Sequence, residues 1–413
     1  MLNKLYGAAL VGQSGGPTAA INSSLAGVIE GFFNSEYITK LYGMKNGIEG
    51  FLSESIVNLG DLFASDSGLI DNDKIMALKR TPSAALGSCR KKLPDPDEDE
   101  AFFENLLSLF KKYDIRYFFY IGGNDSMDTV AKLSKYLKKA DYEMRTVGLP
   151  KTIDNDLSST DHSPGFGSAA KYVATTVQEI VRDCAVYKTK AVTIVEIMGR
   201  DAGWLTASSA LAAHAPDYIY LPETPFSDEK FLSDIEKAFL HHPNVVIAVS
   251  EGLLYENGRY VGEGAQSGKA DIFGHKYLAG VGKALEALVR ERIGCKVRSV
   301  ELNLPQRCAA HLASLTDLSE AENSAKTGVS AAESGESGIM IAIKRNNTPE
   351  YSVSYTVMDV TKIANQIQSV PKDYIVPDGN YVNEKCIAYM RPLIMGEAPV
   401  MFENGVPVHF IIE

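Results

Sequence analysis

The stretch Gly148-Leu-Pro-Lys-Thr-Ile-Asp-Asn-Asp156 directly follows Tyr142–Val147, an apolar run that predicts a short buried strand. Pro150 disfavours a helix at this point, so the stretch should be extended or form a turn. Side chains two residues apart in an extended chain point to the same side, which would place Asp154 and Asp156 together. One carboxylate could then abstract a proton while the other helps to hold a metal cation. Taken alone, the stretch is equally compatible with a solvated polar turn.

A glycine-rich turn lies near the start of the chain, between a strand predicted at Tyr6–Val11 and a helix predicted at Ile21–Phe33. Its sequence is Gly12-Gln-Ser-Gly-Gly-Pro17, in which Gly15 and Gly16 let the backbone approach an anion closely. The helix that follows would add unpaired N–H groups and the positive end of its dipole. A phosphate group could bind here, although such turns also occur in doubly wound folds that bind no phosphate.

A second strand-to-helix turn, Gly122-Gly-Asn-Asp-Ser126, follows a strand predicted at Arg116–Ile121. Ligands of open α/β sheets bind beyond the carboxyl ends of the strands. We therefore expect both glycine turns and the Pro150–Asp156 segment to meet in one crevice. Asp125 would repel a phosphate group in that crevice unless a metal ion lay between them.

Three consecutive cations, Arg90, Lys91 and Lys92, stand out in a chain whose formal net charge is −11. A solvated loop is the usual fate of such a run. The alternative is a clamp on phosphate oxygens, for which the planar guanidinium of Arg90 is best suited. An acidic chain has to meet an anionic substrate with a local basic cluster of this kind.

The composition is that of an ordinary globular protein: the 413 residues are 45% hydrophobic and 23% charged, enough for two or three domains. The net negative charge argues against a nucleic-acid surface. The five cysteines are scattered and form no Cys-x-x-Cys pair, which predicts reduced thiols in a cytoplasmic protein. We see no signal-peptide pattern and no apolar run of membrane-spanning length, so we expect no membrane partner.

Strands and helices alternate along the rest of the chain, which favours an α/β fold with parallel sheets wound by helices. Further strands are predicted at Ile38–Gly43, Ala191–Ile197, Tyr218–Leu221, Val245–Val249, Val297–Leu302, Gly338–Lys344 and Tyr351–Met358. Further helices are predicted at Phe166–Lys188, Asp228–His242, His275–Ile293 and Leu318–Val329. Residues 314–337 resemble a linker in composition, but the strand that follows them indicates an element inside the fold. The turn Gly264-Ala-Gln-Ser-Gly-Lys269 lacks the spacing and the hydroxyl of a Walker A loop, and no dinucleotide fingerprint occurs.

Six short motifs follow one another in a fixed order, and together they are far more specific than any one of them. They are Gly15-Gly-Pro-Thr-Ala-Ala-Ile-Asn22, Gly122-Gly-Asn-Asp-Ser126, Pro150-Lys-Thr-Ile-Asp-Asn-Asp156, Met198-Gly-Arg200, Glu251-Gly252 and Gln306-Arg307. In this order the chain resembles the phosphofructokinases, and most of all their pyrophosphate-dependent branch, over roughly residues 6 to 345. The resemblance implies two doubly wound Rossmann-like domains with mainly parallel sheets and an active site in the cleft between them.

The resemblance also implies how the chain is divided. Residues 1–163 with about 303–345 would bind the phosphoryl donor, residues 164–302 would bind the sugar phosphate, and residues 346–413 would cover the seam. Arg298 matches a family cation that reaches the sugar 6-phosphate from a neighbouring subunit. A homodimer or homotetramer would then be needed to complete each site.

The implied reaction is the reversible transfer of a phosphoryl group from pyrophosphate to the 1-hydroxyl of fructose 6-phosphate, with Mg²⁺. Asp154 would be the base that takes the proton of the attacking hydroxyl, and Thr152 would hold the sugar 1-position or the transferring group. Asp156 would support the metal, and Arg200 would steady charge in the transition state. Phosphoryl transfer mainly asks a protein for alignment and charge neutralisation, which residues of these types supply.

The same resemblance assigns the binding residues. The donor would be bound by Gly15, Gly16, Arg90, Asp125 and Lys151, with Asp125 and Asp156 near the metal. The sugar phosphate would be bound by Thr152, Met198, Gly199, Arg200, Glu251, Arg298 and Arg307. Relatives that use ATP tend to have glycine at the positions of Asp125 and Lys151, so our hypothesis is that these two side chains exclude ATP and bind pyrophosphate.

Three positions depart from the family pattern, and they concern the metal and the sugar contacts. Asn124 stands where many relatives have a metal-binding aspartate. A second arginine that would cross to a neighbouring subunit is expected just before the Ala191 strand but is missing, and Lys190 is the nearest cation in the sequence. Leu304 replaces a sugar-contacting histidine. Other interpretations are an ATP-dependent kinase of the same fold, a non-catalytic regulatory subunit, an NAD kinase and a Rossmann dehydrogenase. The chain lacks the glycine fingerprint that a Rossmann dehydrogenase would have. The Met198 and Gln306 motifs favour the sugar enzyme over the NAD kinase.

Overall fold

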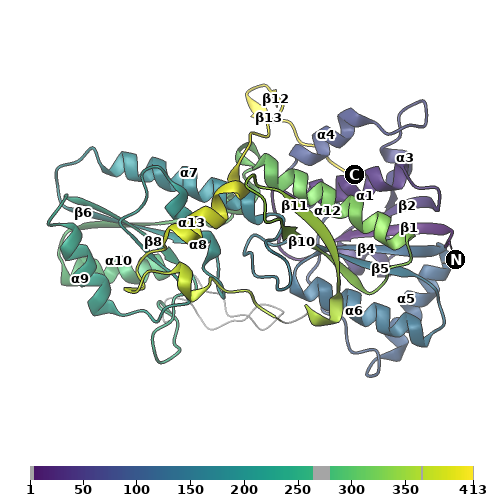
Figure 1. The fold of residues 1–413 in the computed structure, drawn as a ribbon, viewed down its shortest axis with the longest axis horizontal. Helices are drawn as coiled ribbons and strands as arrows, with labels where there is room; N and C mark the ends of the chain where they lie inside the picture. Colours follow the sequence, from purple (N-terminus) through teal and green to yellow (C-terminus); the bar gives the residue numbers. More distant parts are fainter. Residues whose placement is uncertain (1–3, 264–279, 364–365, 413) are drawn as a thin grey trace.

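The structure, a computed structural model, describes residues 4–263, 280–363 and 366–412, and two β-sheets lie side by side along its longest axis (Figure 1). Helices cover both faces of each sheet, which confirms the α/β class and the two doubly wound units. The turn Gly264–Lys269 and the first residues of the helix predicted at His275–Ile293 lie outside the described residues. Within these ranges, no helix combines the length and the apolar character needed to cross a membrane.

The larger sheet contains seven strands in the order β11-β10-β5-β4-β1-β2-β3. The central strands are parallel, whereas the edge strands β3 and β11 run antiparallel to β2 and β10. The strands are β1 (Gly7–Gln13), β2 (Ile38–Met44), β3 (Ile56–Asn58), β4 (Ile115–Gly122), β5 (Arg145–Pro150), β10 (Ile339–Arg345) and β11 (Val353–Asp359). Because the central strands are parallel, the carboxyl ends of β1, β4 and β5 meet at one edge.

The smaller sheet contains four parallel strands in the order β7-β8-β6-β9. They are β6 (Ala191–Ile197), β7 (Tyr218–Tyr220), β8 (Asn244–Ser250) and β9 (Lys296–Glu301). A short hairpin of β12 (Phe402–Glu403) and β13 (Val406–Pro407) stands apart from both sheets (Figure 1).

The helices occupy the connections between the strands. The longer ones are α1 (Ile21–Phe33), α4 (Asn72–Arg80), α5 (Glu100–Lys112), α6 (Asn124–Lys139), α7 (Phe166–Cys184), α9 (Asp228–Ala238), α10 (Val281–Arg292), α12 (Leu315–Glu333) and α13 (Glu384–Met390). The short ones are α2 (Gly47–Leu52), α3 (Leu59–Leu62), α8 (Trp204–Ala207), α11 (Pro305–Cys308) and the 3₁₀ turns η1 (Ser208–Leu211), η2 (Ala310–Leu312), η3 (Val360–Lys362), η4 (Lys372–Tyr374) and η5 (Arg391–Ile394). In Figure 1, α1 and α12 lie on one face of the larger sheet and α5 and α6 on the other.

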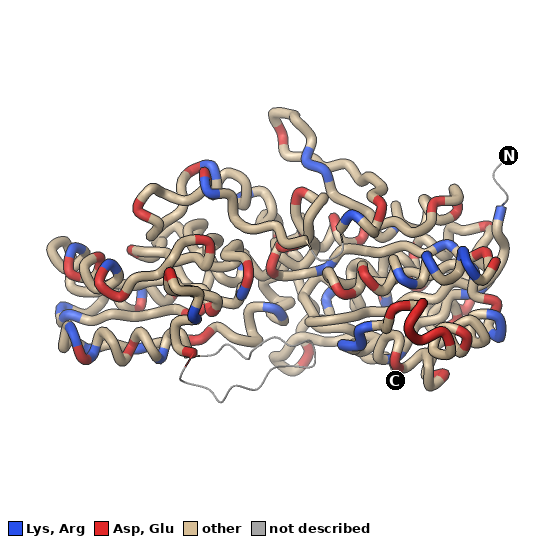
Figure 2. The backbone as a smooth tube through the Cα atoms, turned by 90° about the horizontal axis from the view of Figure 1, so that it is seen from below, with Lys and Arg blue, Asp and Glu red and all other residues tan. Residues whose placement is uncertain are grey.

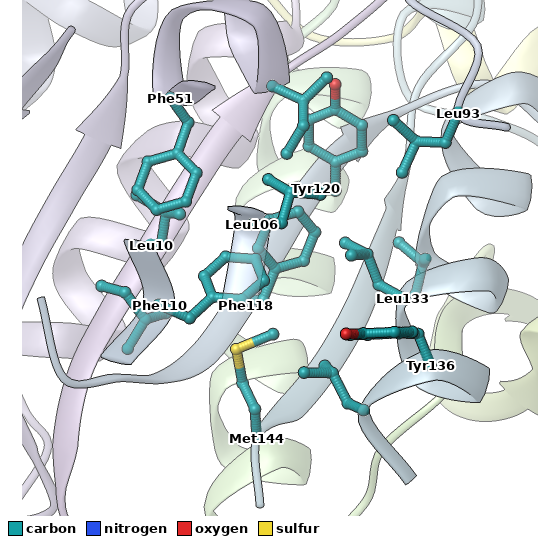
Figure 3. Packing of buried hydrophobic residues seen from close by; sticks show 14 of the residues in the cluster. Leu10, Phe51, Leu93, Leu106, Phe110, Phe118, Tyr120, Leu133, Tyr136 and Met144 are labelled. Carbon is teal, nitrogen blue, oxygen red and sulfur yellow. The ribbon is translucent and has the colours of Figure 1, made fainter. Parts of the chain in front are cut away.

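Alternating side chains of the central strands enter two separate cores. Leu10 of β1 and Phe118 of β4 pack with α2, α5 and α6 in the cluster shown in Figure 3. Their neighbours Val11 and Phe119 pack on the opposite face with α1 and α12. A strand buried on both faces reads as a continuous apolar run, which is why β1, β4 and β6 were predictable from the sequence.

The helices α1 and α12 approach each other unusually closely. A methyl group added at Gly27 of α1 would lie 2.3 Å from the carbonyl oxygen of Glu322 on α12, so a side chain has no room there. Lys79 and Lys326 bridge Glu30 and Glu322 over the same contact. The segment that resembled a linker is therefore a helix packed into the fold, as predicted from the strand that follows it.

Most element boundaries differ from the prediction by one to a few residues. The strand expected at Tyr142–Val147 is β5, Arg145–Pro150, because Tyr142 and Met144 are buried in a loop before it. Pro150 pairs with Gly122 as the last residue of β5, and it lies beyond Val147 and Gly148, where β10 pairs with this strand. The helix expected to reach Lys188 ends at Cys184.

Charged residues of both signs are interspersed along the described chain, as Figure 2 shows. Each of the five cysteines is a free thiol. The C-terminal residues from Val353 contribute the edge strand β11 to the larger sheet, and α13 then packs into the core of the smaller sheet near α8 (Figure 1).

The close contact of α1 and α12 predicts that Gly27→Ala destabilises the fold, although alanine favours a helix by about 1 kcal/mol over glycine. The new methyl group would meet a backbone carbonyl, which cannot rotate away, so we expect a net loss of about 1–3 kcal/mol. Urea denaturation followed by circular dichroism measures this. Ser330→Ala on the exposed face of α12 is the control and should change stability by less than about 0.5 kcal/mol. Equal stability of Gly27→Ala and the wild type would refute the close packing.

Candidate active site

A cavity of about 450 Å³ opens between the carboxyl ends of the two sheets. It is lined by Ser14, Gly15, Gly16, Cys89, Arg90, Lys91, Gly123, Asn124, Asp125, Ser126, Lys151, Thr152, Asp154, Asp156, Arg200, Asp201, Ala202, Glu251 and Ile367. The loops after β1, β4 and β5 supply one side, and the loops after β6 and β8 supply the other. The two glycine turns and the Pro150–Asp156 segment thus share one crevice, as expected from their place after parallel strands.

The ends of the three strands are tied together by backbone hydrogen bonds. Ser14 N donates to Ile121 O at 2.9 Å, and Lys151 N donates to Gly122 O at 3.0 Å. On the far side, Glu251 N donates to Ile197 O at 2.9 Å. These bonds hold the cavity loops in register with the rigid sheets, which is what a preorganised site requires.

The segment that carries the two carboxylates is a turn and not an extended strand. Asn155 has a φ of +54°, in the left-handed region, and the hydroxyl of Thr152 accepts a hydrogen bond from Asp154 N at 3.1 Å. The expectation of strand-like alternation is therefore wrong at this point. Asp154 and Asp156 nevertheless line the same cavity, because the left-handed residue between them turns the chain.

The two carboxylates lie in a buried environment that disfavours their charge. Burial raises the pKa of Asp154, and the neighbouring carboxylates of Asp156 and Glu251 raise it further, against the opposing effect of Lys151 and Arg200. Burial also raises the pKa of Asp156. Carboxyl groups perturbed in this way inside a cleft are typical of sites that move protons.

Lys151 is a cation that acts on this acidic pair and is only 3% exposed. Burial lowers the pKa of Lys151 to about 8, while Asp154 and Asp156 oppose this shift. Its ammonium group donates to Gly16 O at 2.6 Å, which joins the lysine to the first glycine turn. The turn, the cation and the acidic pair therefore form one unit.

The first glycine turn presents backbone to the cavity. Gly15 has a φ of +77°, which a larger residue would adopt only with strain, and its N–H donates to Cys89 O at 3.1 Å. The hydroxyl of Ser88 donates to Gly15 O at 2.7 Å. These bonds place the segment that carries Arg90 directly beside the turn.

Sequence reasoning missed the polar network behind this turn. The buried Gln13 side chain accepts from Leu86 N at 2.9 Å and donates to the Asn22 side chain at 2.9 Å. Asn22 in turn donates to Thr81 O at 2.8 Å and accepts from Ala85 N at 2.9 Å. Gln13 and Asn22 stand in the quoted glycine motif, but only the fold shows that they fasten residues 81–86.

The second glycine turn brings oxygen ligands to the cavity. Asn124 and Asp125 form the start of α6, and the side-chain oxygen of Asn124 is buried without a hydrogen-bond partner. Asp125 and Asp156 line the same space, and oxygen donors of these kinds suit a hard cation such as Mg²⁺. Within the described ranges, no cluster of three or more His, Cys, Asp or Glu side chains is placed to hold a metal ion.

The loops of the smaller sheet are held by Glu251 and Gln306. Glu251 accepts from Gly199 N at 3.4 Å, and Gln306 accepts from Met198 N at 3.2 Å. Gly199 has a φ of +126°, and a methyl group at Gly252 would lie 1.9 Å from Arg200 O, so the loops lie in close backbone contact. Arg200 and Glu251 line the cavity, whereas Met198 and Gly199 do not.

Two of the predicted cations lie outside the lining of the cavity. Arg307 is close to its rim, since a methyl group at Gly16 would lie 3.5 Å from a guanidinium nitrogen of Arg307. Arg298 lies farther away, on β9 opposite Thr193 of β6, where it lines a separate hollow of about 240 Å³. A single chain thus does not bring Arg298 to Asp154.

Of the three departures from the family pattern, Asn124 lines the cavity, whereas Lys190 and Leu304 do not. Lys190 rests on the ring of Phe239, 5.0 Å from its centroid, and Leu304 is 52% exposed before α11. Asp201 and Ile367 were not singled out from the sequence, yet both line the cavity. Asp201 follows the Met198-Gly-Arg200 motif, whereas no local pattern marks Ile367.

The fold and the site define a two-lobed α/β protein with a cavity between its lobes that is lined by charged side chains of both signs. The phosphofructokinase family model matches residues 8–322. The chain is 40% identical to a pyrophosphate--fructose 6-phosphate 1-phosphotransferase of Halomonas elongata, over 97% of this chain and 94% of the relative. It is also 31% identical to a sulfofructose kinase of Alkalicoccus urumqiensis, over 91% and 92% of the two chains.

A solved structure gives the same result. The crystal structure of a pyrophosphate-dependent phosphofructokinase from Nitrosospira multiformis superposes with a TM-score of 0.87 at 34% identity, covering 98% of this chain and 96% of that one. This protein belongs to the phosphofructokinase family. The resemblance inferred from the six motifs is confirmed, and the Halomonas and Nitrosospira proteins are both named as pyrophosphate-dependent enzymes.

The raised pKa of Asp154 predicts that Asp154→Asn stabilises the folded protein at neutral pH. In the wild type, the raised pKa of Asp154 in the folded state means that protonation of this carboxyl stabilises the fold. This stabilisation is fully present below the ordinary carboxyl pKa and is lost as pH rises through the raised pKa. The amide of the variant carries no charge to desolvate. We therefore expect its free energy of unfolding to exceed that of the wild type by about 1–3 kcal/mol at pH values above the raised pKa, and to differ little at low pH.

Thermal unfolding of both proteins between about pH 4 and pH 9 measures this difference, because this range extends from about the carboxyl pKa of the unfolded chain to beyond the raised pKa of Asp154. Asp66→Asn, on an exposed loop, is the matched control and should shift nothing. A stability difference that does not depend on pH would contradict the assignment of the raised pKa to Asp154.

Proposed function

We propose that this protein transfers a phosphoryl group reversibly between pyrophosphate and the 1-hydroxyl of fructose 6-phosphate. The observation that carries the proposal is the presence of Asp125, Lys151 and Asp154 around one cavity. One ligand can thus reach Asp154, the base for an alcohol. It can also reach Asp125 and Lys151, the two side chains that distinguish pyrophosphate from a nucleotide. Relatives named for this activity match nearly the whole chain.

In this proposal Asp154 takes the proton of the attacking hydroxyl, and its position between Lys151 and Arg200 supports the role. A base with a pKa near the working pH is the most effective. The guanidinium of Arg200 and the hydroxyl of Thr152 hold the transferring phosphoryl group. Asp156 balances these cations, since all four side chains line the same space.

The pyrophosphate donor is bound by the backbone of Gly15 and Gly16 together with Arg90 and Lys151. These groups meet through the hydrogen bonds of Gly15 with Cys89 and of Lys151 with Gly16. Asp125 occupies space that the inner phosphate of ATP would need and repels its charge. This arrangement favours pyrophosphate as donor over ATP.

Mg²⁺ would suit the oxygen ligands of Asn124, Asp125 and Asp156, three residues that line the cavity. When bound, the ion would neutralise charge on the diphosphate. The unpartnered oxygen of Asn124 supports a share of the contact for this residue, in place of the aspartate of many relatives.

The sugar phosphate is bound by Met198, Gly199 and Glu251 from the loops of the smaller sheet, together with Arg307, which lies near Gly16 at the rim of the cavity. Arg298 lies too far from Asp154 to act within one chain, which supports its role in a neighbouring subunit's site and a homodimer or homotetramer. In this arrangement residues 1–163 and 303–345 form the donor domain, residues 164–302 the sugar-phosphate domain, and residues 346–413 cover the seam. The free thiols support a cytoplasmic setting.

One assay tests the proposal: purified protein with Mg²⁺, pyrophosphate or ATP as donor, and fructose 6-phosphate or its 6-sulfonate analogue as acceptor. We expect turnover with pyrophosphate and fructose 6-phosphate in both directions and little with ATP. Asp154→Asn should lose about 10² to 10⁴-fold in kcat while KM stays near the wild-type value, because a general base acts only in the chemical step. Preference for ATP, preference for the sulfonate, or full turnover of the variant would each overturn one part of the proposal.

The donor hypothesis predicts that replacing both Asp125 and Lys151 by glycine weakens use of pyrophosphate and admits ATP. Loss of a buried charge-assisted contact should lower kcat/KM for pyrophosphate by about 10- to 100-fold, and turnover with ATP should become measurable. Steady-state kinetics with each donor checks this. Asp128→Gly, in the same helix but outside the cavity, controls for a glycine in α6. An unchanged donor preference in the double variant would refute the hypothesis.

A further inference from the structure

The turn that carries the two active-site carboxylates is fastened by the C-terminal part of the chain. Asn155, between Asp154 and Asp156, is 1% exposed and donates from its side-chain amide to the hydroxyl of Tyr389 on α13 at 3.1 Å. The amide oxygen of Asn155 accepts from Ser163 N at 2.9 Å. The Asn155 side chain therefore points away from the cavity, into a hydrogen-bonded socket.

Tyr389 is itself held firmly in place. The Tyr389 hydroxyl donates its proton to Asp161 O at 2.6 Å. The same hydroxyl oxygen can therefore only accept the hydrogen bond from the Asn155 amide. The guanidinium of Arg345 lies 4.6 Å from the centre of the Tyr389 ring, and the Trp204 ring lies 5.0 Å away on another side. A ring enclosed in this way offers a rigid anchor for Asn155.

A second contact from the C-terminal part of the chain reaches Asp156, the residue after Asn155. Gln368 N donates to Asp156 O at 2.8 Å, and the indole N–H of Trp204 donates to Gln368 O at 2.9 Å. Ile367 pairs with Leu157 as an isolated antiparallel bridge and also lines the cavity. Residues 155, 156 and 157 are thus each tied to the chain beyond β11.

The conformation of Asn155 decides where both carboxylates point. A non-glycine residue adopts a positive φ only when its surroundings hold it there, and the strain is about 1 kcal/mol or more. If Asn155 relaxed to the extended region, the peptide between Asp154 and Asp156 would rotate and the pair would separate. Side-chain anchors at Asn155 therefore act directly on the geometry of the acidic pair.

We propose that Tyr389 is a positioning residue for phosphoryl transfer: its hydroxyl holds Asn155 in the left-handed conformation that keeps Asp154 and Asp156 in the cavity. Tyr389 does not line the cavity, so it acts through Asn155 and touches no substrate. This proposal rests on the function proposed above, in which Asp154 is the base. It gives residues beyond β11 a part in catalysis as well as in packing.

Tyr389→Phe tests the inference because it removes the hydroxyl and leaves the ring between Arg345 and Trp204. A displacement of the base by about 1 Å costs roughly 10²-fold, so we expect kcat to fall by about 10- to 100-fold while KM for both substrates changes less than threefold. Tyr374→Phe is the matched control, because its ring also packs against Trp204 and its hydroxyl makes no hydrogen bond within the described residues. The control should keep wild-type kcat, and both variants should melt at similar temperatures.

A double-mutant cycle with Asn155→Gly separates positioning from a general loss of packing. Glycine tolerates the positive φ but has no amide to meet Tyr389, so this variant should also lose kcat. If Tyr389 acts through Asn155, the double variant should be no slower than the slower single variant. Multiplied losses, or equal kcat in Tyr389→Phe and Tyr374→Phe, would overturn the inference. Absence of turnover in the wild type would instead count against the proposed function, so the two failures are distinguishable.

Discussion

The structure depends on the burial of one cation and two carboxylates around a single cavity. Lys151 is buried and Asp154 and Asp156 are partly buried, which disfavours each of these charges in isolation. Their mutual attraction offsets part of the cost, and an anionic donor with a cation would offset more. The site is therefore least stable when empty, and the scaffold around it must be correspondingly rigid.

That rigidity comes from the way the chain is layered. Parallel strands buried on both faces direct the loops after β1, β4 and β5 to one edge, and backbone bonds between Ser14, Ile121, Gly122 and Lys151 lock their ends. The close contact of α1 and α12 supports the larger sheet from behind. The smaller sheet brings Arg200 and Glu251 from the other side, so alignment across the cleft is built into the fold rather than into flexible side chains.

Local patterns predicted a large part of this arrangement. The helix at Ile21–Phe33 and the strand at Ala191–Ile197 have the predicted bounds, because continuous apolar runs and helical spacing are local properties. The shared crevice followed from a general rule about strand ends. The conformation of Asn155 did not follow, since a left-handed residue between two aspartates is stabilised by Tyr389 and Ser163, which no short window of sequence contains.

By itself the sequence determined the alternation of strands and helices, the glycine turns and the acidic and basic side chains at their tips, because these depend on residues within one turn or strand. It also determined the family, because six motifs in one order are a property of the chain alone. Only the tertiary structure decided that Ile367 and Tyr389 reach the catalytic turn and that Arg298 does not. These are contacts between residues far apart in sequence, and their energies exist only once the two sheets and the C-terminal segment have packed.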